Sequence, residues 1–337
     1  MSRSVVTGGA GFIGSALVGE LVADEGAEVL VLDNLSTGKL ENLAAVAGRI
    51  RFHQVDLASY DDIAPLVAGA DVVYHMAAIP SVPRSIREPV TSHVANVDGT
   101  FQLLRAAVDG GARRVVYAAS SSAYGDSETL PKHETMAPKP LSPYAAQKLM
   151  GEYYASVFHE CFRLPTVSLR FFNVYGPRQD PTSPYSGVIS VFMKCLLERR
   201  SPPIYGDGEQ SRDFTYVEDV VALCLKAARA PGVAGKMFNG GNGNRYTLNQ
   251  VWRMLESIEG VEIAPTHLES RLGDVRHSQA DIGSAVRELG HAPRFSLEEG
   301  LRRTLAWYRS SGAVSPEAPP PSAGTTRRPA LQASQPR

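Results

Sequence analysis

Hydrophobic residues in the first half of the chain follow two alternating patterns. Short runs rich in β-branched residues are followed by longer stretches in which apolar residues recur with the period of an amphipathic helix. Strands that alternate with helices of this length form βαβ units, and their crossovers require a parallel sheet covered on both faces. The pattern therefore predicts an α/β fold with a doubly wound parallel sheet. Strands are expected at residues 4–7, 28–33, 50–54, 72–75, 114–118 and 166–170, and helices include 13–23, 93–109 and 144–162.

The pattern changes twice along the remaining sequence. Beyond residue 175 it becomes irregular and rich in Pro and Gly, with helices expected near 188–198, 217–228, 248–256 and 297–310. From residue 311 onward the chain has six prolines and no aromatic residue, so it cannot bury enough apolar surface to order itself. We expect a first domain over residues 1–172 with some later segments returning to it, a smaller α/β substrate-binding lobe mainly over 173–310, and a disordered tail over 311–337.

The composition excludes several classes of protein. The 337 residues include 34 Lys and Arg against 35 Asp and Glu, so no excess of positive charge attracts the chain to nucleic acid or to an anionic membrane. No apolar run is long enough for a membrane span, and glycines within the first dozen residues interrupt any signal-peptide core. Three scattered cysteines form no disulfide framework, and eight scattered histidines have no metal-ligand spacing. We therefore expect a cytoplasmic protein without a metal site.

A glycine-rich turn links the first predicted strand to the first predicted helix. Its sequence, Thr7-Gly-Gly-Ala-Gly-Phe-Ile-Gly14, contains Gly-x-Gly-x-x-Gly. Glycines allow a tight turn and a close backbone approach to a pyrophosphate, and the helix N-terminus then presents unpaired N–H groups to the negative charge. The motif also occurs in ordinary turns, but here a strand precedes it, a helix follows it, and an acidic residue ends the next strand. This context indicates a Rossmann-type dinucleotide site.

The acidic residue, Asp33, predicts which dinucleotide binds. A carboxylate 19 positions beyond Gly14 accepts hydrogen bonds from the adenosine ribose and repels a 2′-phosphate. The following segment, residues 34–38, contains no Arg. The expected cofactor is therefore NAD rather than NADP. Asp56 and Leu57, after the third predicted strand, are expected near the adenine.

A tyrosine, a lysine and a serine form the candidate catalytic group. Tyr144 and Lys148 are four residues apart on a predicted helix and hence on one face, and Ser120 follows a predicted strand at the carboxyl edge of the sheet. A tyrosine with a pKa of about 10 is a poor base at neutral pH, and bringing it to about 7 requires roughly 4 kcal/mol of preference for the phenolate. A lysine ammonium and a positive nicotinamide ring together suffice in a partly dehydrated cleft.

Taken together and in this order, these motifs resemble an extended short-chain dehydrogenase/reductase, and specifically a UDP-hexose 4-epimerase. The resemblance extends from residue 1 to about residue 308 and includes the segments 75–78, 170–177, 206–214 and 273–281. It implies that Tyr144 is the base, that Lys148 lowers its pKa and binds the nicotinamide ribose, and that Ser120 hydrogen-bonds the reacting oxygen. A tightly held NAD, a transient 4-keto sugar and a homodimer are also implied. Apolar residues on more than one face of the helices 93–109 and 144–162 agree with a dimer.

The resemblance also assigns residues to the two ligands. For NAD the residues are Gly8, Gly11, Phe12, Ile13, Gly14, Asp33, Asn34, Ser36, Thr37, Gly38, Asp56, Leu57, Ala77, Ala78, Asn96, Tyr144 and Lys148. For the UDP-sugar they are Ser81, Arg84, Ser120, Ser121, Ser122, Tyr144, Asn173, Val188, Arg212, Arg271, Asp274 and Ser278. Arg212 and Arg271 suit bidentate phosphate binding, Asp274 suits the ribose, and Asn173 suits a phosphate or sugar oxygen.

Three short segments resemble the subgroup that acts on UDP-N-acetylhexosamines, namely 81–85, 178–181 and 276–279. Ser278 falls where relatives restricted to glucose and galactose carry a bulky aromatic residue, and a small residue leaves room for a 2-N-acetyl group. We therefore expect interconversion of UDP-GlcNAc and UDP-GalNAc, with UDP-Glc and UDP-Gal as possible further substrates.

Other activities remain open at this point. A 4,6-dehydratase would need an Asp-Glu pair where Ser121 and Ser122 stand, so dehydration is disfavoured. A UDP-uronate 4-epimerase or decarboxylase shares much of the framework and stays an alternative, although the segment 178–181 argues against it. A regulator that binds NAD or a nucleotide sugar without turnover is the alternative from another class. The complete set of Ser120, Tyr144 and Lys148 argues against this regulator.

Overall fold

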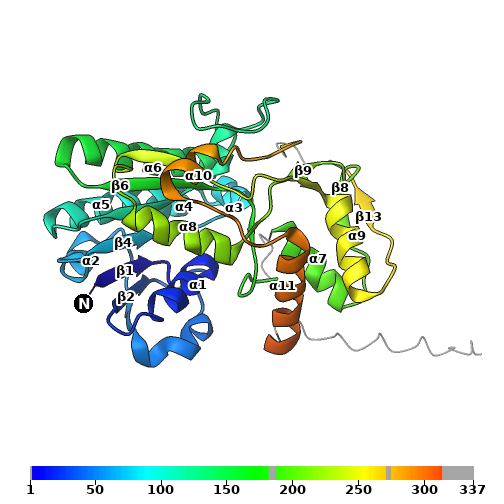
Figure 1. Ribbon diagram of the computed structural model, residues 1–337, viewed down its shortest axis with the longest axis horizontal. Coiled ribbons are helices and arrows are strands. Elements are labelled where there is room, and N and C mark those ends of the chain that lie inside the picture. Colours follow the sequence, from blue (N-terminus) through cyan, green and yellow to red (C-terminus); the bar gives the residue numbers. More distant parts are fainter. Residues whose placement is uncertain (1, 182–186, 271–274, 313–337) are drawn as a thin grey trace, which may run out of the picture.

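A seven-stranded parallel sheet forms the centre of the computed structural model, which describes residues 2–181, 187–270 and 275–312 (Figure 1). The strand order is β11-β6-β5-β4-β1-β2-β3. The strands are β1 (Arg3–Thr7), β2 (Glu28–Asp33), β3 (Arg51–Gln54), β4 (Val72–His75), β5 (Val115–Ser120), β6 (Thr166–Phe171) and β11 (Lys236–Gly240). The predicted α/β fold with a doubly wound parallel sheet is confirmed.

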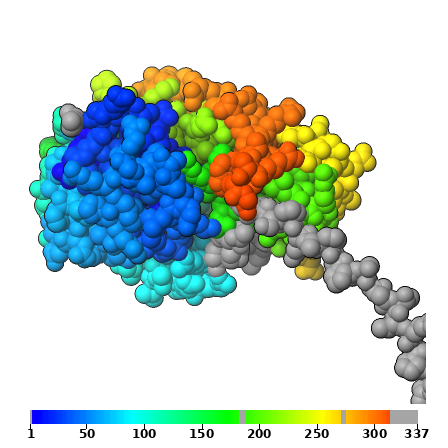
Figure 2. Space-filling model, turned by 90° about the horizontal axis from the view of Figure 1, so that it is seen from below, coloured from blue at the N-terminus to red at the C-terminus, as the bar shows by residue number. Residues whose placement is uncertain are grey.

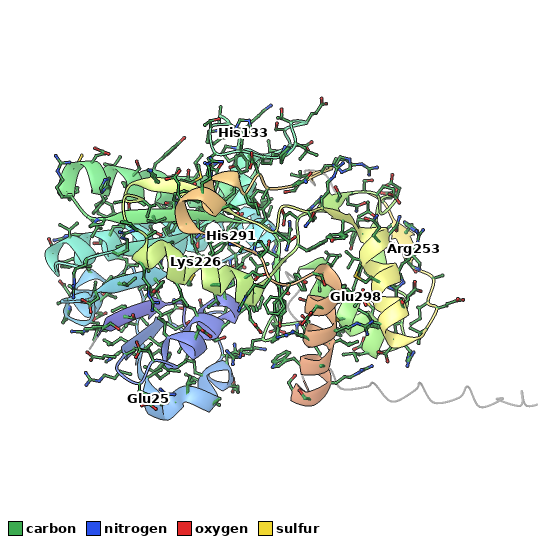
Figure 3. The ribbon with its side chains drawn as sticks, viewed as in Figure 1. Glu25, His133, Lys226, Arg253, His291 and Glu298 are labelled. Atoms are coloured by element: carbon green, nitrogen blue, oxygen red, sulfur yellow. The ribbon has the colours of Figure 1, made fainter. Side chains whose placement is uncertain are left out.

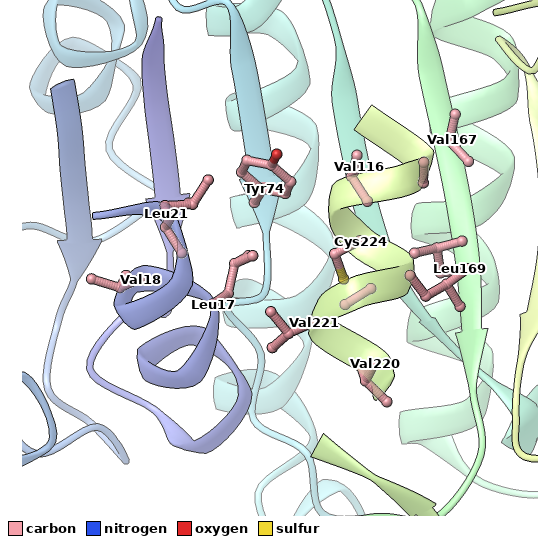
Figure 4. Packing of buried hydrophobic residues seen from close by; sticks show 14 of the residues in the cluster. Leu17, Val18, Leu21, Tyr74, Val116, Val167, Leu169, Val220, Val221 and Cys224 are labelled. Atoms are coloured by element: carbon pink, nitrogen blue, oxygen red, sulfur yellow. The ribbon is translucent and has the colours of Figure 1, made fainter. Parts of the chain in front are cut away.

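Helices cover both faces of this sheet because alternate residues of each strand point to opposite sides. Val6 packs with α1 (Phe12–Leu21) and α8 (Val217–Arg229) on one face. Figure 4 shows the same cluster, with Leu17 of α1 and Val221 of α8. Its neighbour Val5 packs into the opposite cluster with α2 (Tyr60–Val67), α5 (Gly99–Asp109) and residues of α6 (Pro143–Phe162). Both faces of the inner strands β1, β2, β4 and β5 are therefore buried, which explains their mainly apolar sequences, whereas the edge strand β3 is partly exposed and more polar.

The smaller lobe has its own apolar core on the right of Figure 1. Its helices are α7 (Val188–Leu197), α9 (Leu248–Glu259) and α11 (Leu297–Ser311). Three short strand pairs complete it: β7 (Val174–Tyr175) with β10 (Thr215–Tyr216), β8 (Pro203–Tyr205) with β13 (Thr266–Leu268), and β9 (Ser211–Arg212) with β12 (Tyr246–Thr247). Buried Trp252 packs edge-on against Phe192 at 5.4 Å between ring centroids. In Figure 2 the orange α11 lies between the blue N-terminal part and the yellow part of this lobe.

Many charged side chains are exposed, among them Glu25, Arg253 and Glu298, which are labelled in Figure 3. The remaining elements are short: η1 (Leu40–Arg49), α3 (Val82–Arg87), α4 (Pro89–His93), η2 (Val94–Asp98), η3 (Ser121–Tyr124) and α10 (Gly283–Leu289). Two later segments join the first domain, since β11 pairs with β6, and α10 contributes Ala285 and Leu289 to the core around α1.

The predicted helix over residues 93–109 is helical throughout, but it contains a π-helical turn and begins four residues earlier, at Pro89. The chain forms α4 up to His93, a π-helical turn over η2, and then α5. Within the turn, the Thr100 hydroxyl donates to the Asn96 carbonyl oxygen (2.7 Å), and the Asn96 side chain bonds outside its helix. Such side-chain bonds compete with the regular backbone ladder, and periodicity alone does not reveal them. The six predicted strands are confirmed with ends shifted by at most two residues, whereas β11 was not predicted.

Close contact with β5 fixes the position of α6. The Tyr117 hydroxyl of β5 donates to the Lys148 carbonyl oxygen (3.1 Å), and a Cβ added at Gly151 would lie 2.2 Å from the Tyr117 hydroxyl oxygen. One turn further along the same side, the Glu152 carboxylate accepts two hydrogen bonds from the guanidinium of Arg170 in β6 (2.6 and 2.8 Å), and both side chains are buried. The helix therefore has one fixed position over the end of the sheet.

We predict that Gly151→Ala destabilises the protein by about 1–3 kcal/mol, because the new methyl group overlaps the Tyr117 hydroxyl. Gly19→Ala is the matched control, since Gly19 is also helical and a Cβ there meets nothing within 4 Å. This control is expected to raise stability by about 0.5–1 kcal/mol. Urea unfolding of both variants measures the two changes, and equal effects at the two positions would contradict the proposed contact.

Candidate active site

The glycine turn between β1 and α1, residues 8–14, encloses a narrow space that side chains would fill. This space is called the cradle below. Gly8 has a φ of 67°, and a Cβ there would lie 2.6 Å from the Ala77 backbone. A Cβ at Gly14 would lie 2.1 Å from the Gly8 carbonyl oxygen. Helix α1 begins after Gly11 with no side-chain cap and no acidic residue in its first turn. Its open N–H groups and positive end of the helix dipole fit the pyrophosphate of a dinucleotide.

Asp33 at the end of β2 shapes the loop beside this cradle. One carboxylate oxygen accepts the Ala10 N–H (2.9 Å) and the other accepts the Leu35 N–H (2.8 Å). Burial raises the pKa of Asp33, although both hydrogen bonds favour its ionised form. A carboxylate has about four lone-pair sites, so Asp33 keeps acceptor capacity for ribose hydroxyls. The residue therefore holds the loop and is suited to bind the cofactor.

A single large cleft connects the cradle to the smaller lobe. Its volume is about 1730 Å³, which exceeds the usual size of a site for one small molecule and leaves room for a dinucleotide and a second ligand. Most residues that the sequence assigned to the two ligands line it: Gly8, Gly11, Phe12, Ile13, Gly14, Asp33, Asn34, Ser36, Thr37, Gly38, Asp56, Leu57, Ala77, Ala78, Ser81, Arg84, Ser120, Ser121, Ser122, Tyr144, Lys148, Asn173, Arg212 and Ser278.

Two assigned residues do not line the cleft. Asn96 is buried behind its wall, where its amide oxygen accepts the Ile79 N–H (2.7 Å) and its amide nitrogen donates to Gln147 (2.9 Å). Val188 begins α7 and packs against the core of the smaller lobe, next to the cleft-lining Gly187. Arg271 and Asp274 lie outside the described residues.

The three catalytic candidates meet at the carboxyl edge of the sheet. Ser120 ends β5, and its hydroxyl lies 2.8 Å from that of Ser122. Tyr144 lies in the first turn of α6, where Ser142 caps the helix by accepting the Ala145 N–H. Burial raises the pKa of Tyr144, and a hydrogen bond with the Ser120 hydroxyl opposes that rise. The protein groups alone therefore do not produce the lowered tyrosine pKa that the sequence predicted, and further positive charge in the cleft is needed for it.

Lys148 is buried beneath the cleft with 4% of its surface exposed. Burial lowers its pKa to about 7, and its Nζ lies 4.5 Å from the centroid of the Tyr117 ring. His75 at the end of β4 is also buried, with Nδ1 at 2.8 Å from the Thr7 hydroxyl and Nε2 at 2.8 Å from the Thr100 hydroxyl. Burial and the Lys148 charge lower the pKa of His75 to about 3, so it is a neutral support.

On the side of the smaller lobe, loop contacts hold Arg212 and Ser278 near each other. The Ser278 N–H donates to the Ser211 carbonyl oxygen (3.0 Å), and a guanidinium nitrogen of Arg212 donates to the same oxygen (3.0 Å). Asp213 is completely buried and accepts the N–H groups of Asn242 (2.8 Å) and Ala280 (3.1 Å). Burial raises the pKa of Asp213 to about 6. This buried carboxylate ties together the loops that carry Arg212 and Ser278.

Several cleft residues were not assigned from the sequence. Lys39, Lys132, Arg178, Asp180 and Trp307 all line the cleft. Arg178 and Asp180 belong to a segment noted only for its resemblance to one subgroup, and Lys39 directly follows the assigned loop. Among residues 2–181, 187–270 and 275–312, no group of three or more His, Cys, Asp or Glu could hold a metal ion. Within the same ranges no helix is both long and apolar enough to cross a membrane.

Comparison with known proteins agrees with this geometry. Residues 4–241 match the NAD dependent epimerase/dehydratase family. The chain belongs to this family. A UDP-glucose 4-epimerase of Mycolicibacterium smegmatis is 38% identical over 91% of this chain and 99% of the relative.

Solved structures of family members extend the comparison. A UDP-N-acetylglucosamine 4-epimerase from Methanobrevibacter ruminantium M1, in complex with UDP-N-acetylmuramic acid, has a TM-score of 0.88 at 38% identity and covers 92% of this chain and 99% of its own. A UDP-glucuronic acid 4-epimerase from Bacillus cereus, in complex with UDP-glucuronic acid and NAD, has a TM-score of 0.86 at 33% identity. The match covers 92% of this chain and 99% of the Bacillus cereus chain. The chain is thus an NAD-dependent enzyme of the UDP-sugar 4-epimerase type, as its resemblance implied.

We predict that Lys148→Met stabilises the cofactor-free enzyme near neutral pH. The pKa of Lys148 falls from 10.5 to about 7 on folding, so between these values the unfolded chain binds more protons and the free energy of unfolding rises with pH. The variant lacks the buried cation and is expected to lose this rise. Urea unfolding at several pH values above 7 measures it, with Lys194→Met on the smaller lobe as control. If the free energy of unfolding of Lys148→Met still rises with pH as in the wild type, Lys148 is not the source of this pH dependence.

Proposed function

We propose that the enzyme interconverts UDP-GlcNAc and UDP-GalNAc and also epimerises UDP-Glc and UDP-Gal. The observation that carries this proposal is the small side chain of Ser278 in the wall of the cleft that also contains Ser120 and Tyr144. A large aromatic ring at this position would take the space that a 2-N-acetyl group requires. The similar UDP-N-acetylglucosamine 4-epimerase, solved with an N-acetylated UDP-sugar, supports the same choice.

We assign the chemical steps to the three residues at the carboxyl edge of the sheet. Tyr144 removes the proton of the sugar 4-hydroxyl, and the Ser120 hydroxyl donates a hydrogen bond to the same oxygen as it becomes a carbonyl. Lys148 stabilises the phenolate and holds the nicotinamide ribose. NAD, when bound, would supply the acceptor and then the donor of the C4 hydride. After the 4-keto sugar has turned within the cleft, Tyr144 returns its proton to the 4-oxygen, so C4 is inverted without net oxidation.

The remaining polar residues of the cleft are assigned to binding. The glycine turn holds the pyrophosphate of NAD, Asp33 the adenosine ribose, and Asp56 with Leu57 the adenine. Arg212 lines the cleft and is suited to bind the UDP diphosphate. Asn173, which lines the same cleft, is suited to bind a phosphate or sugar oxygen. Arg271 and Asp274 remain our candidates for further contacts to UDP.

We also propose that the enzyme is a homodimer in the cytoplasm. The exposed face of α5 and α6 carries an unusual number of large apolar residues: Phe101, Met150, Tyr153, Tyr154, Val157 and Phe162. An exposed apolar patch on two adjacent helices is typical of an interface between copies of a chain. The free thiols Cys161, Cys195 and Cys224 fit a reducing compartment. Sedimentation of the full chain at twice 36.3 kDa tests the dimer.

We predict that Tyr144→Phe lowers kcat by about 10²- to 10⁴-fold, because the variant lacks the general base. Its affinity for the UDP-sugar is expected to change little, since the phenyl ring keeps its place in the cleft. Tyr60→Phe in α2, away from the cleft, is the matched control and is expected to keep its activity. Steady-state kinetics and calorimetric binding measure both quantities. Near wild-type kcat in Tyr144→Phe would refute the assigned base, and full inactivity of the wild type with tight sugar binding would favour a regulator.

We predict that Ser278→Tyr abolishes turnover of UDP-GlcNAc and UDP-GalNAc while UDP-Glc and UDP-Gal are still converted. The control Ser278→Ala removes only the hydroxyl and is expected to accept both pairs. Purified enzyme without added NAD is incubated with each substrate and with UDP-glucuronate. The products are separated by chromatography and their masses are measured by mass spectrometry. A parallel loss of both activities in Ser278→Tyr would overturn the role of Ser278. Turnover of UDP-glucuronate alone would favour the uronate alternative, with loss of carbon dioxide marking a decarboxylase.

A further inference from the structure

Two charged side chains from the smaller lobe cross to the first domain beside the glycine turn. A guanidinium nitrogen of Arg178 donates to the Ser15 carbonyl oxygen in the first turns of α1 (2.9 Å). Asp180 forms an ion pair with Lys39, with 2.7 Å between its carboxylate oxygen and the lysine Nζ. Lys39 follows the loop that Asp33 shapes and directly precedes η1. Both contacts therefore reach segments next to the glycine turn, since Ser15 directly follows Gly14 and Lys39 bonds to Ala10.

The Lys39–Asp180 ion pair is attached firmly at both ends. The Lys39 N–H donates to the Ala10 carbonyl oxygen of the glycine turn (2.9 Å). On the other side, the carbonyl oxygen of Gln179 accepts a hydrogen bond from the hydroxyl of Tyr308, which belongs to the core of the smaller lobe. Closing the ion pair thus ties the cofactor turn of one lobe to the core of the other.

The backbone beside the ion pair is held in an uncommon conformation. Arg178 has a φ of 71°, a left-handed value that residues with a Cβ seldom adopt. Such conformations persist where surrounding contacts enforce them, and they are found preferentially at ligand clamps and switch regions. Lys39 and Asp180 also line the same cleft as Gly11, Phe12 and the 33–38 loop. The segment that carries Asp180 therefore forms part of the cleft wall near the proposed cofactor site.

We propose that Lys39 and Asp180 form a clasp that slows the dissociation of NAD. Since the same NAD must accept and return one hydride, loss of the cofactor between these steps would strand the sugar as a ketone. A clasp across the mouth of the cradle lengthens the time for which the cofactor stays bound. The proposal rests on the NAD dependence of the family and is independent of which UDP-sugar the enzyme converts.

A different role for Lys39 makes the opposite prediction for Asp180. If Lys39 acted only by attracting the NAD pyrophosphate, the nearby Asp180 carboxylate would weaken that attraction, and Asp180→Asn would slow the release of NAD. In a clasp Asp180 is the required partner, so its removal speeds release. The direction of the change in Asp180→Asn therefore distinguishes the two roles.

The test follows the loss of radiolabelled NAD from the full-length enzyme during a chase with unlabelled NAD. The Lys39 and Asp180 side chains are 53% and 32% exposed, so the ion pair is partly solvated. Lys39→Met and Asp180→Asn are each expected to release NAD about two- to fivefold faster than wild type, and the double variant is expected to release it no faster than either single one. Arg51→Met is the matched control, because it removes a comparable ion pair with Glu28 (2.9 Å) away from the cleft, and no change is expected.

Slower or unchanged release from Asp180→Asn would overturn the clasp. Additive effects in the double variant would do so as well, because they would show that the two residues act separately. The readout needs no sugar turnover, so a failure of the clasp is distinct from a failure of the proposed epimerase activity. If the wild-type enzyme is inactive on every UDP-sugar while Lys39→Met, Asp180→Asn and the double variant all release NAD faster than it does, only the proposed epimerase activity is refuted.

Discussion

The arrangement of the active site depends on the contact between α6 and β5. Gly151 lets the helix approach the Tyr117 hydroxyl, and this hydroxyl bonds the Lys148 carbonyl oxygen on the same helix. Helix α6 brings Tyr144 and Lys148, while β5 brings Ser120, so the relative position of the three functional groups is set by this one contact. The buried ion pair between Glu152 and Arg170 adds a second constraint at the next turn. A rigid scaffold of this kind holds reacting groups in a fixed geometry before any ligand binds.

Burial of charge is the second feature that organises the site. The charge of Lys148 acts on neutral His75, and the two hydroxyls that flank the imidazole satisfy its hydrogen bonds without adding an anion. The imidazole adds no anion beside the buried lysine, and burial lowers the pKa of Lys148 to about 7. Asp213 in the smaller lobe is the opposite case, since backbone N–H groups from two loops surround its carboxylate. Burial thus changes the pKa of Lys148, a residue that lines the cleft, whereas the buried carboxylate of Asp213 holds loops together.

Much of the fold and of the site could be predicted because their signals are local in the sequence. The apolar runs that become β1 to β6 and the spacing of Gly8 to Gly14, Asp33, Ser120, Tyr144 and Lys148 each depend on short segments. The π-helical turn at Asn96 and the ion pair of Lys39 with Asp180 depend on partners far away in the chain, so no periodicity could reveal them. Asn96 resembles a cofactor ligand in sequence, but its amide is taken up by Ile79 and Gln147.

The path of the chain between the lobes has a consequence for their independence. The polypeptide leaves the central sheet after β6, returns to it with α8 and β11, leaves again for α9, and returns once more with α10 before α11. No single cleavage point therefore separates the two lobes into autonomous pieces. Any relative rotation must bend several connections at once, which restricts the freedom of a hinge. Recombination between relatives that exchanged one contiguous fragment would likewise divide at least one hydrophobic core.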